Sequence, residues 1–299
     1  MESMAKIVIR GIPHAYDLTV QPTEDSRPAL VFIHGWLLSR HYWQPLVAKL
    51  APNYRCLTYD LRGFGESGGS PVTTASTAYS LAAYATDLLD LLAALEIEQA
   101  WVIGHSLGGS IALWAAARAP HAIAGTIGVN AGGGIYLKEE FERFRAAGQR
   151  IATWRPKWLR YIPLLDWVFT RAMVVQPLAR HWGRQRLLDF IQADTAAALG
   201  SLLESTTEAE VHRLPQLVAR LDQPAYFLAG AQDTVMETKY VRHLASFHRL
   251  FQQGQENAVE IADCGHLAMV EQPDAVNAAI QTILARHVHQ PQSTLSQPR

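Results

Sequence analysis

The strongest constraint on the fold is an alternation, along most of the chain, of short β-branched apolar runs with longer amphipathic stretches. The strand candidates are KIVIRG, AYDLTV, ALVFIHG, RCLTYD, AWVIGH, AGTIGV, AYFLAG and AVEIAD. The helix candidates between them include residues 78–95, 107–118, 238–248 and 274–287. This pattern is typical of parallel strands that helices cover on both faces. We therefore predict an α/β fold with a mostly parallel eight-stranded sheet flanked by helices.

The alternation stops between residues 134 and 215, where a helical segment rich in tryptophan and arginine intervenes. We interpret residues 134–215 as a helical cap or lid inserted into a core of residues 1–133 and 216–288. The end of the chain, residues 289–299, is polar and contains two prolines, so we expect a flexible tail.

The composition excludes several classes of protein. A hydrophobic content of 49% in 299 residues is ample for a large core, and a net charge of -1 gives no basic excess for nucleic acid. Cys56 and Cys264, the two cysteines, form neither a disulfide framework nor a metal cluster, which favours a reducing compartment. The sequence contains no apolar stretch of membrane-spanning length and no secretion signal, so we expect a cytoplasmic protein.

Residues 104–108 read GHSLG and match G-x-S-x-G, in which a serine lies in a sharp turn between a strand and a helix. The flanking runs AWVIG and LGGSIALWAAARA have the required strand and helix character. Gly104, Gly108 and Gly109 leave room for so tight a bend, because a Cβ would collide there. We interpret Ser106 as a nucleophile. The alternative is an ordinary helix N-cap, for which serine is also common.

A serine nucleophile needs a base to accept its proton and an acid to orient that base. His266 follows the last strand candidate, and Asp233 follows the strand candidate before it. Because the carboxyl ends of parallel strands gather at one edge of a sheet, we expect both to meet Ser106. The order serine, aspartate, histidine is also that of an α/β-hydrolase triad.

Other polar residues near these strands compete for the role of the acid. Asp222 precedes its strand and is expected at the opposite edge of the sheet. Asn130 follows the strand candidate AGTIGV but cannot carry a negative charge. Asp263 is the stronger rival. We predict the catalytic triad Ser106, Asp233 and His266.

From VFIHGW to HLAMVEQP the chain resembles the α/β-hydrolase superfamily, and in particular its lid-bearing serine esterases and lipases. HGW at residues 34–36 resembles the oxyanion loop of that family. The resemblance implies that the backbone N–H groups of Trp36 and Leu107 hold the developing oxyanion. YDLRGFGES resembles the loop after the fourth strand, in which four residues would shape the turn rather than react: Asp60, Arg62, Gly63 and Gly65.

Haloalkane dehalogenase-like and epoxide hydrolase-like members of the superfamily resemble this chain but have an aspartate at the position of Ser106, so we set both activities aside. We predict a serine hydrolase that cleaves a carboxylic ester with a hydrophobic acyl or alcohol group through an acyl-enzyme, without metal or organic cofactor. The same triad would serve a C–C bond hydrolase, a thioesterase or a perhydrolase. A non-catalytic binding protein is a further alternative, which an intact triad disfavours.

The predicted lid is expected to select the substrate, because it would lie over the carboxyl ends of the strands. We expect Trp36, His105, Trp154 and Trp158 to contact a small hydrophobic ester. Residues 143–186 contain ten lysines and arginines against the single acid Asp166.

Two interpretations of this cationic, aromatic segment stay open. The tryptophans pack the lid against the core, with arginines extending around them. Alternatively, the lid contacts anionic membranes or lipid aggregates. The sequence leaves the oligomeric state open.

Overall fold

The computed structural model describes residues 5–20, 27–68, 79–132 and 138–288, and the predicted tail, residues 289–299, lies outside them. Its eight strands form one sheet in the order β1-β2-β4-β3-β5-β6-β7-β8. Strand β2 pairs antiparallel with β1 and β4, and the remaining pairs are parallel. The predicted fold class is confirmed. The strands are β1 Ala5–Ile9, β2 Ile12–Leu18, β3 Ala29–Ile33, β4 Cys56–Tyr59, β5 Ala100–His105, β6 Ile123–Val129, β7 Ala225–Gly230 and β8 Ala258–Ile261.

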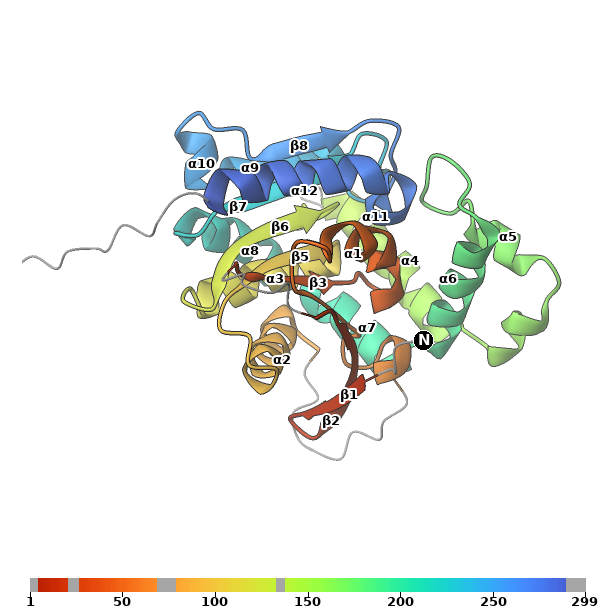
Figure 1. The fold of residues 1–299 in the computed structure, drawn as a ribbon. Coiled ribbons are helices and arrows are strands. Elements are labelled where there is room, and N and C mark those ends of the chain that lie inside the picture. Colours follow the sequence, from red (N-terminus) through yellow and green to blue (C-terminus); the bar gives the residue numbers. More distant parts are fainter. Residues whose placement is uncertain (1–4, 21–26, 69–78, 133–137, 289–299) are drawn as a thin grey trace, which may run out of the picture.

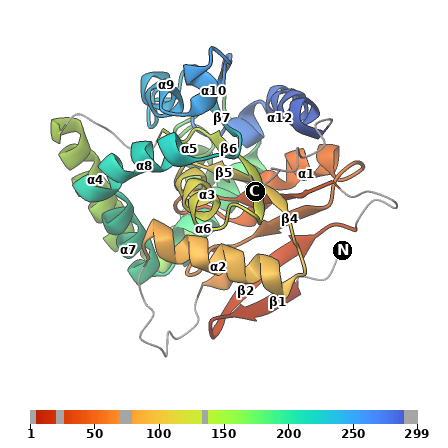
Figure 2. The same cartoon turned by 90° about the vertical axis from the view of Figure 1, so that its left-hand side faces the viewer.

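Two hydrophobic clusters lie on opposite faces of the sheet, because successive side chains of a strand point to opposite sides. In β3, Val31 and Ile33 enter one cluster, whereas Leu30 and Phe32 enter the other. The first cluster is completed by α2 Leu81–Ala94, α3 Leu107–Arg118, α8 Glu208–Arg220 and α9 Thr238–Ser246. The second is completed by α1 Gln44–Leu50 and α12 Pro273–Val288. Figure 2 shows α1 and α12 on one side of the sheet and α2 and α3 on the other.

The remaining short helices lie in connections of this core. They are η1 Arg40–Trp43, η2 Gly65–Ser67, α10 Arg249–Gln252 and α11 Ala268–Glu271. None of these four lies within the helix candidates named from the sequence. Among the described residues, no helix combines the length and the apolar character that crossing a bilayer requires.

Between β6 and β7 the chain forms a helical insertion. We call its first five helices the inserted helices: α4 Lys138–Thr153, η3 Lys157–Tyr161, α5 Leu165–Phe169, α6 Arg180–Gln192 and α7 Thr195–Ser205. Within them α4 packs against α7, and α5 packs against α6. Figure 1 shows α5 and α6 together at one side of the molecule. The expected junction between residues 215 and 216 falls inside α8, which packs against α3 of the core.

Candidate active site

Ser106 lies in the turn between β5 and α3, with φ of 50° and ψ of -114°. This positive-φ conformation is costly for a residue with a Cβ and has to be held by its surroundings. The Ser106 N–H donates to the Val129 carbonyl at 2.9 Å. A Cβ on Gly104 would lie 2.2 Å from the Gly108 carbonyl oxygen, so the turn closes only because glycine is present there. The local geometry is that of a nucleophile turn.

Asp233 and His266 form a buried pair at the same edge of the sheet. The His266 Nδ1 atom lies 2.7 Å from Asp233 Oδ2, and the other carboxylate oxygen accepts hydrogen bonds from the backbone N–H groups of Val235 at 2.8 Å and Met236 at 3.0 Å. Burial alone would raise the pKa of Asp233, but the charge and hydrogen bond of His266 and the two backbone donors outweigh it. The pKa of Asp233 therefore lies below its ordinary value, and the carboxyl stays ionised.

The competing polar residues do not take the place of Asp233. Asp263 and Asp222 are exposed, and neither makes a hydrogen bond with His266 in the described part of the chain. Asn130 instead supports the pair, because its amide donates to Asp233 Oδ2 at 2.8 Å and to the Gly265 carbonyl at 3.1 Å. The sequence had shown only that Asn130 cannot be the acid.

His105, which the sequence predicts to contact substrate, also contacts the backbone of His266. Its side chain reaches the cavity wall, but the residue is only 1% exposed and its Nε2 lies 2.7 Å from the His266 carbonyl oxygen. Burial lowers the pKa of His105 to about 3, so its ring is neutral. A neutral ring that donates from Nε2 to this carbonyl fixes the backbone of His266. His105 therefore supports the loop of His266, and because it also lines the cavity, its contact with substrate stays a prediction.

Glu271 is a supporting residue that sequence reasoning missed. Its carboxylate accepts hydrogen bonds from the backbone N–H groups of Gly265 at 3.0 Å and Leu267 at 2.9 Å, on either side of His266. It also accepts one from the Val175 N–H at 2.8 Å, which ties the inserted segment to the histidine loop. One sequence feature could have indicated this role: Glu271 lies in the first turn of a short helix, where a carboxylate can accept hydrogen bonds from the backbone N–H groups before it.

The two backbone N–H groups implied for an oxyanion site lie next to the serine turn. Leu107 is the first residue of α3, so its N–H has no partner one helical turn earlier. Trp36 lies in the loop after β3 and lines the same cavity as Leu107 and Ser106. The Trp36 indole Nε1–H donates to the Ala198 carbonyl in α7 at 2.9 Å, which anchors this loop to the inserted helices.

A cavity of about 640 Å³ opens beside Ser106 and His266. Its lining is mainly apolar, with contributions from α4, α6 and α7 that include Phe144, Ile151, Phe190 and Leu202. Arg186 is the sole lysine, arginine, aspartate or glutamate among the described lining residues. Its guanidinium donates to the carbonyls of Phe169 and Ala172, the latter at 2.8 Å. Both bonds come from Nη1, so the chain holds this nitrogen of the guanidinium in place.

Trp154 and Trp158, both expected to contact substrate, are absent from the described lining of this cavity. Trp154 lies at a separate cavity of about 440 Å³, which Arg155 and Ile191 also line. Trp154 is 65% exposed and Trp158 is 54% exposed. The expectation was wrong because the inward positions of this segment are taken by other apolar residues, Leu159 among them.

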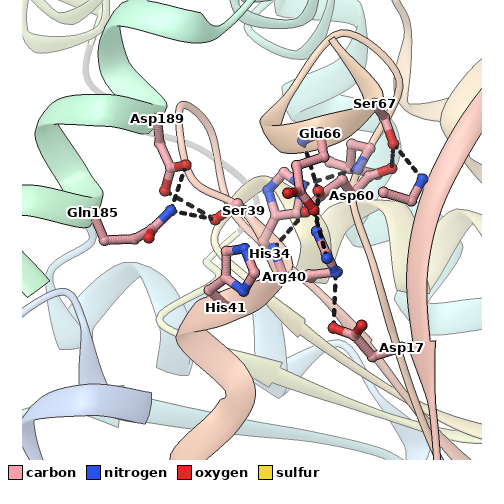
Figure 3. Close-up of polar contacts among 12 residues, drawn as sticks. Asp17, His34, Ser39, Arg40, His41, Asp60, Glu66, Ser67, Gln185 and Asp189 are labelled. Carbon is pink, nitrogen blue, oxygen red and sulfur yellow. Dashed lines mark hydrogen bonds and ion pairs between the residues drawn. The ribbon is translucent and has the colours of Figure 1, made fainter. Parts of the chain in front are cut away.

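The contact between the core and α6 includes a buried carboxylate, Asp189 (Figure 3). Asp189 accepts a hydrogen bond from the Ser39 hydroxyl at 2.9 Å and one from the Gln185 amide at 3.0 Å. Burial, the largest influence, raises the pKa of Asp189 to about 7. Asp189 therefore changes charge near neutral pH while it joins the core to an inserted helix.

The loop at residues 59–67 is held by a charged network, as Figure 3 also shows. Arg40 contacts Asp60 at 2.7 Å and Asp17 at 2.8 Å, and Asp60 also accepts the Glu66 N–H at 2.8 Å. A Cβ on Gly65, whose φ is +50°, would lie 2.5 Å from the Asp60 carboxyl carbon. These contacts shape the turn around Asp60.

No group of three or more histidine, cysteine, aspartate or glutamate side chains in the described ranges is arranged to hold a metal ion. The cysteines of the chain, Cys56 and Cys264, are both buried and unbridged.

Comparison with known proteins gives the chain its family. It is 30% identical over 260 residues to a 2-succinyl-6-hydroxy-2,4-cyclohexadiene-1-carboxylate synthase from an Enterobacter species, with 86% of this chain and 92% of the relative covered. It is 28% identical over 261 residues to 3-oxoadipate enol-lactonase 2 of Acinetobacter baylyi, with 87% and 90% covered. A thermophilic esterase from Thermogutta terrifontis has a similar structure, with a TM-score of 0.72 at 24% identity over 96% of this chain and 100% of that chain. The family model described as alpha/beta hydrolase fold matches residues 28–273, and the chain therefore belongs to the α/β-hydrolase family.

Proposed function

We propose that the protein is a serine hydrolase that cleaves a carboxylic ester with an apolar acyl or alcohol group. One observation carries the proposal: a serine in a strained turn shares an apolar cavity with a histidine whose other ring nitrogen contacts a buried, ionised aspartate. This combination of nucleophile, base and orienting acid is what acyl transfer requires.

In the first half of the reaction, Ser106 Oγ attacks the ester carbonyl carbon while Nε2 of His266 accepts the hydroxyl proton. Asp233 holds the Nδ1–H side of the ring and stabilises the imidazolium that forms. The backbone N–H groups of Trp36 and Leu107 receive the negative charge that develops on the carbonyl oxygen. The tetrahedral intermediate then collapses, and His266 gives its proton to the departing alcohol.

In the second half, water attacks the acyl group on Ser106, with His266 as base and then as acid toward the serine oxygen. The products are the free carboxylic acid and the restored enzyme. Every proton moves through the same imidazole, so this cycle uses only groups of the chain and water.

The lining of the cavity supports an apolar ester over a substrate with several carboxylates. One relative is named as an enol-lactonase, a class of enzyme that acts on a cyclic ester, and the name of another relative contains a carboxylate group. A buried carboxylate needs a paired cation, and the described lining offers one, Arg186, whose Nη1 is held by two backbone carbonyls, so a substrate with several carboxylates would leave at least one unpaired. The same argument disfavours a C–C bond hydrolase for a dioic substrate. Thioesters and peracid formation would use the same triad.

The inserted helices serve this function as a lid over the cavity. Helices α4, α6 and α7 supply Phe144, Phe190 and Leu202 to its wall, whereas Ser106 and His266 come from the core. The length of the accepted acyl chain therefore depends on the inserted helices more than on the turn that holds the serine.

The test is labelling with a fluorophosphonate probe, followed by hydrolysis of a chain-length series of p-nitrophenyl esters. Ser106→Ala is expected to lose labelling and to lower kcat by several orders of magnitude, up to roughly a millionfold. Ser110→Ala is the matched control, because Ser110 lines the same cavity but is not in the turn. Labelling and esterase activity that survive in a clean preparation of Ser106→Ala would refute the proposal.

A further inference from the structure

Exposed apolar side chains are concentrated in one part of the inserted helices. Nine of the twelve large apolar residues that are exposed in the described structure fall within residues 151–173. We call residues 151–173 the tip segment. The nine are Ile151, Trp154, Trp158, Tyr161, Ile162, Leu164, Trp167, Val168 and Met173. Such a concentration of exposed apolar surface marks an interaction site more often than chance packing.

The inner side of the tip segment already has its own packing. Leu159 is 8% exposed and forms a small cluster with Leu187 and Ile191 of α6, against which Phe169 also packs. Of the four tryptophans in the insertion, Trp182 is the one that packs on the core, stacked 5.5 Å from the Tyr42 ring. Trp154, Trp158 and Trp167 are all more than 40% exposed, so holding the insertion to the core does not account for them.

Cations lie among these exposed aromatic rings. The Arg160 guanidinium lies 4.8 Å from the centre of the Tyr161 ring, and that of Arg171 lies 5.8 Å from the Trp167 ring. Lys157 is also exposed. The acid of this region, Asp166, has a side chain that is only 8% exposed and bonds to Arg180 at 2.7 Å. The surface of the tip segment is therefore positive, although the whole chain has a net charge of -1.

The exposed apolar surface continues into the cavity beside Ser106. Ile151 is 44% exposed and Met173 is 45% exposed, and both also line that cavity. An apolar molecule could therefore pass from whatever surface the tip segment contacts into the cavity, and it would meet apolar side chains along the whole path.

We propose that the tip segment docks on an anionic lipid bilayer. Tryptophan and tyrosine rings favour the boundary between headgroups and acyl chains, and lysines and arginines beside them are attracted to anionic headgroups. A second copy of this chain is a poorer partner, because a two-fold contact through this surface would bring its cations together. The inference goes beyond the proposed hydrolysis and does not depend on it.

The experiment is sedimentation of the full chain with phosphatidylcholine vesicles that contain or lack phosphatidylserine, at low and at high salt. We expect binding to the anionic vesicles that salt weakens. Lys157→Glu with Arg160→Glu is expected to lower the partition coefficient by roughly ten- to a hundredfold. Trp158→Ser with Tyr161→Ser is expected to weaken binding at both salt concentrations, because it removes rings rather than charge.

The matched control is Arg220→Glu with Arg286→Glu, an equal change of charge at the exposed C-terminal ends of α8 and α12. It is expected to bind as the unmodified chain does. Ser106→Ala separates the two proposals, since it should bind vesicles fully whether or not it hydrolyses esters. Two results would overturn the inference. One is absence of binding to anionic vesicles at low salt, and the other is equal binding by the control and by the charge-reversed variant, Lys157→Glu with Arg160→Glu.

Discussion

The side-chain amide of Asn130 donates a 2.8 Å hydrogen bond to Oδ2 of Asp233. This is the oxygen that lies 2.7 Å from the His266 ring, and the same amide also bonds to the carbonyl of Gly265, the residue before that histidine. Asn130 therefore fixes the acid and the histidine loop relative to each other, from the end of a third strand.

Replacement of Asn130 by alanine is expected to lower kcat about tenfold with little change in KM, because an outer-shell hydrogen bond to the acid is lost. Asn130→Asp is expected to be worse than alanine, since a second carboxylate beside Asp233 repels its charge. Steady-state kinetics on a short p-nitrophenyl ester measure both effects. An aspartate variant as active as the alanine variant would contradict this account.

The identity of the acid can be tested by comparing two amide substitutions. Asp233→Asn keeps the shape of the side chain but no longer stabilises the imidazolium, so kcat should fall by roughly 10³- to 10⁴-fold. Asp263→Asn is the control, because Asp263 is exposed, and its activity is expected to stay within about twofold of the unmodified enzyme. If the ranking is reversed, the acid of the triad is Asp263.

The amino-acid sequence predicted the fold in detail where local pattern and tertiary structure agree. All eight strand candidates form strands of one sheet, and the helix predicted over residues 107–118 has those bounds in the structure. The serine turn was visible because sterics demand small residues at Gly104 and Gly108. Asp233 and His266 could be paired because chain order and parallel strands bring their loops to one edge.

The local sequence pattern could not predict the roles of residues that act through contacts with residues far away in the chain. Trp154 and Trp158 were expected at the substrate because composition shows that a segment is aromatic, but not which side of a short helix faces inward. The contacts of Glu271 with Val175, and of Asp189 with Ser39, join elements whose relative position the local pattern does not encode.

The apolar cavity predicts discrimination against a second carboxylate on the substrate. We expect the p-nitrophenyl ester of hexanoic acid to be hydrolysed with a kcat/KM at least about 100-fold above that of the p-nitrophenyl monoester of adipic acid, because an unpaired buried carboxylate is costly. Competition between the two esters at constant pH measures the ratio. Equal rates would contradict this prediction and would mean that the cavity accommodates a second carboxylate.

Asp189 predicts a stability that falls as the pH rises. Its folded-state pKa of about 7 is above its ordinary value of 3.8, so the folded protein holds a proton that the unfolded chain releases. The associated stability is complete below pH of about 4 and is lost as the pH approaches 7, by at most about 4 kcal/mol. Asp189→Asn, which cannot ionise, should therefore gain in stability relative to the unmodified protein as the pH rises.

The measurement for Asp189 is the free energy of unfolding in urea at several pH values between 4 and 8. The exposed substitution Asp263→Asn serves as the control. A difference between Asp189→Asn and the unmodified protein that stays constant across this range would show that Asp189 does not titrate in the folded state.

The bond from the Trp36 indole to the Ala198 carbonyl has a consequence for protein engineering. Exchange of insertions between relatives is an obvious route to new substrate ranges, since the insertion lines the cavity. Here the loop that carries the backbone N–H proposed for the oxyanion site, that of Trp36, is hydrogen-bonded to α7. If a transplanted insertion places no carbonyl at this point, we expect the rate of the chemical step to fall as well as the specificity to change. Chimeras should therefore keep α7 with the core and exchange only α4 to α6.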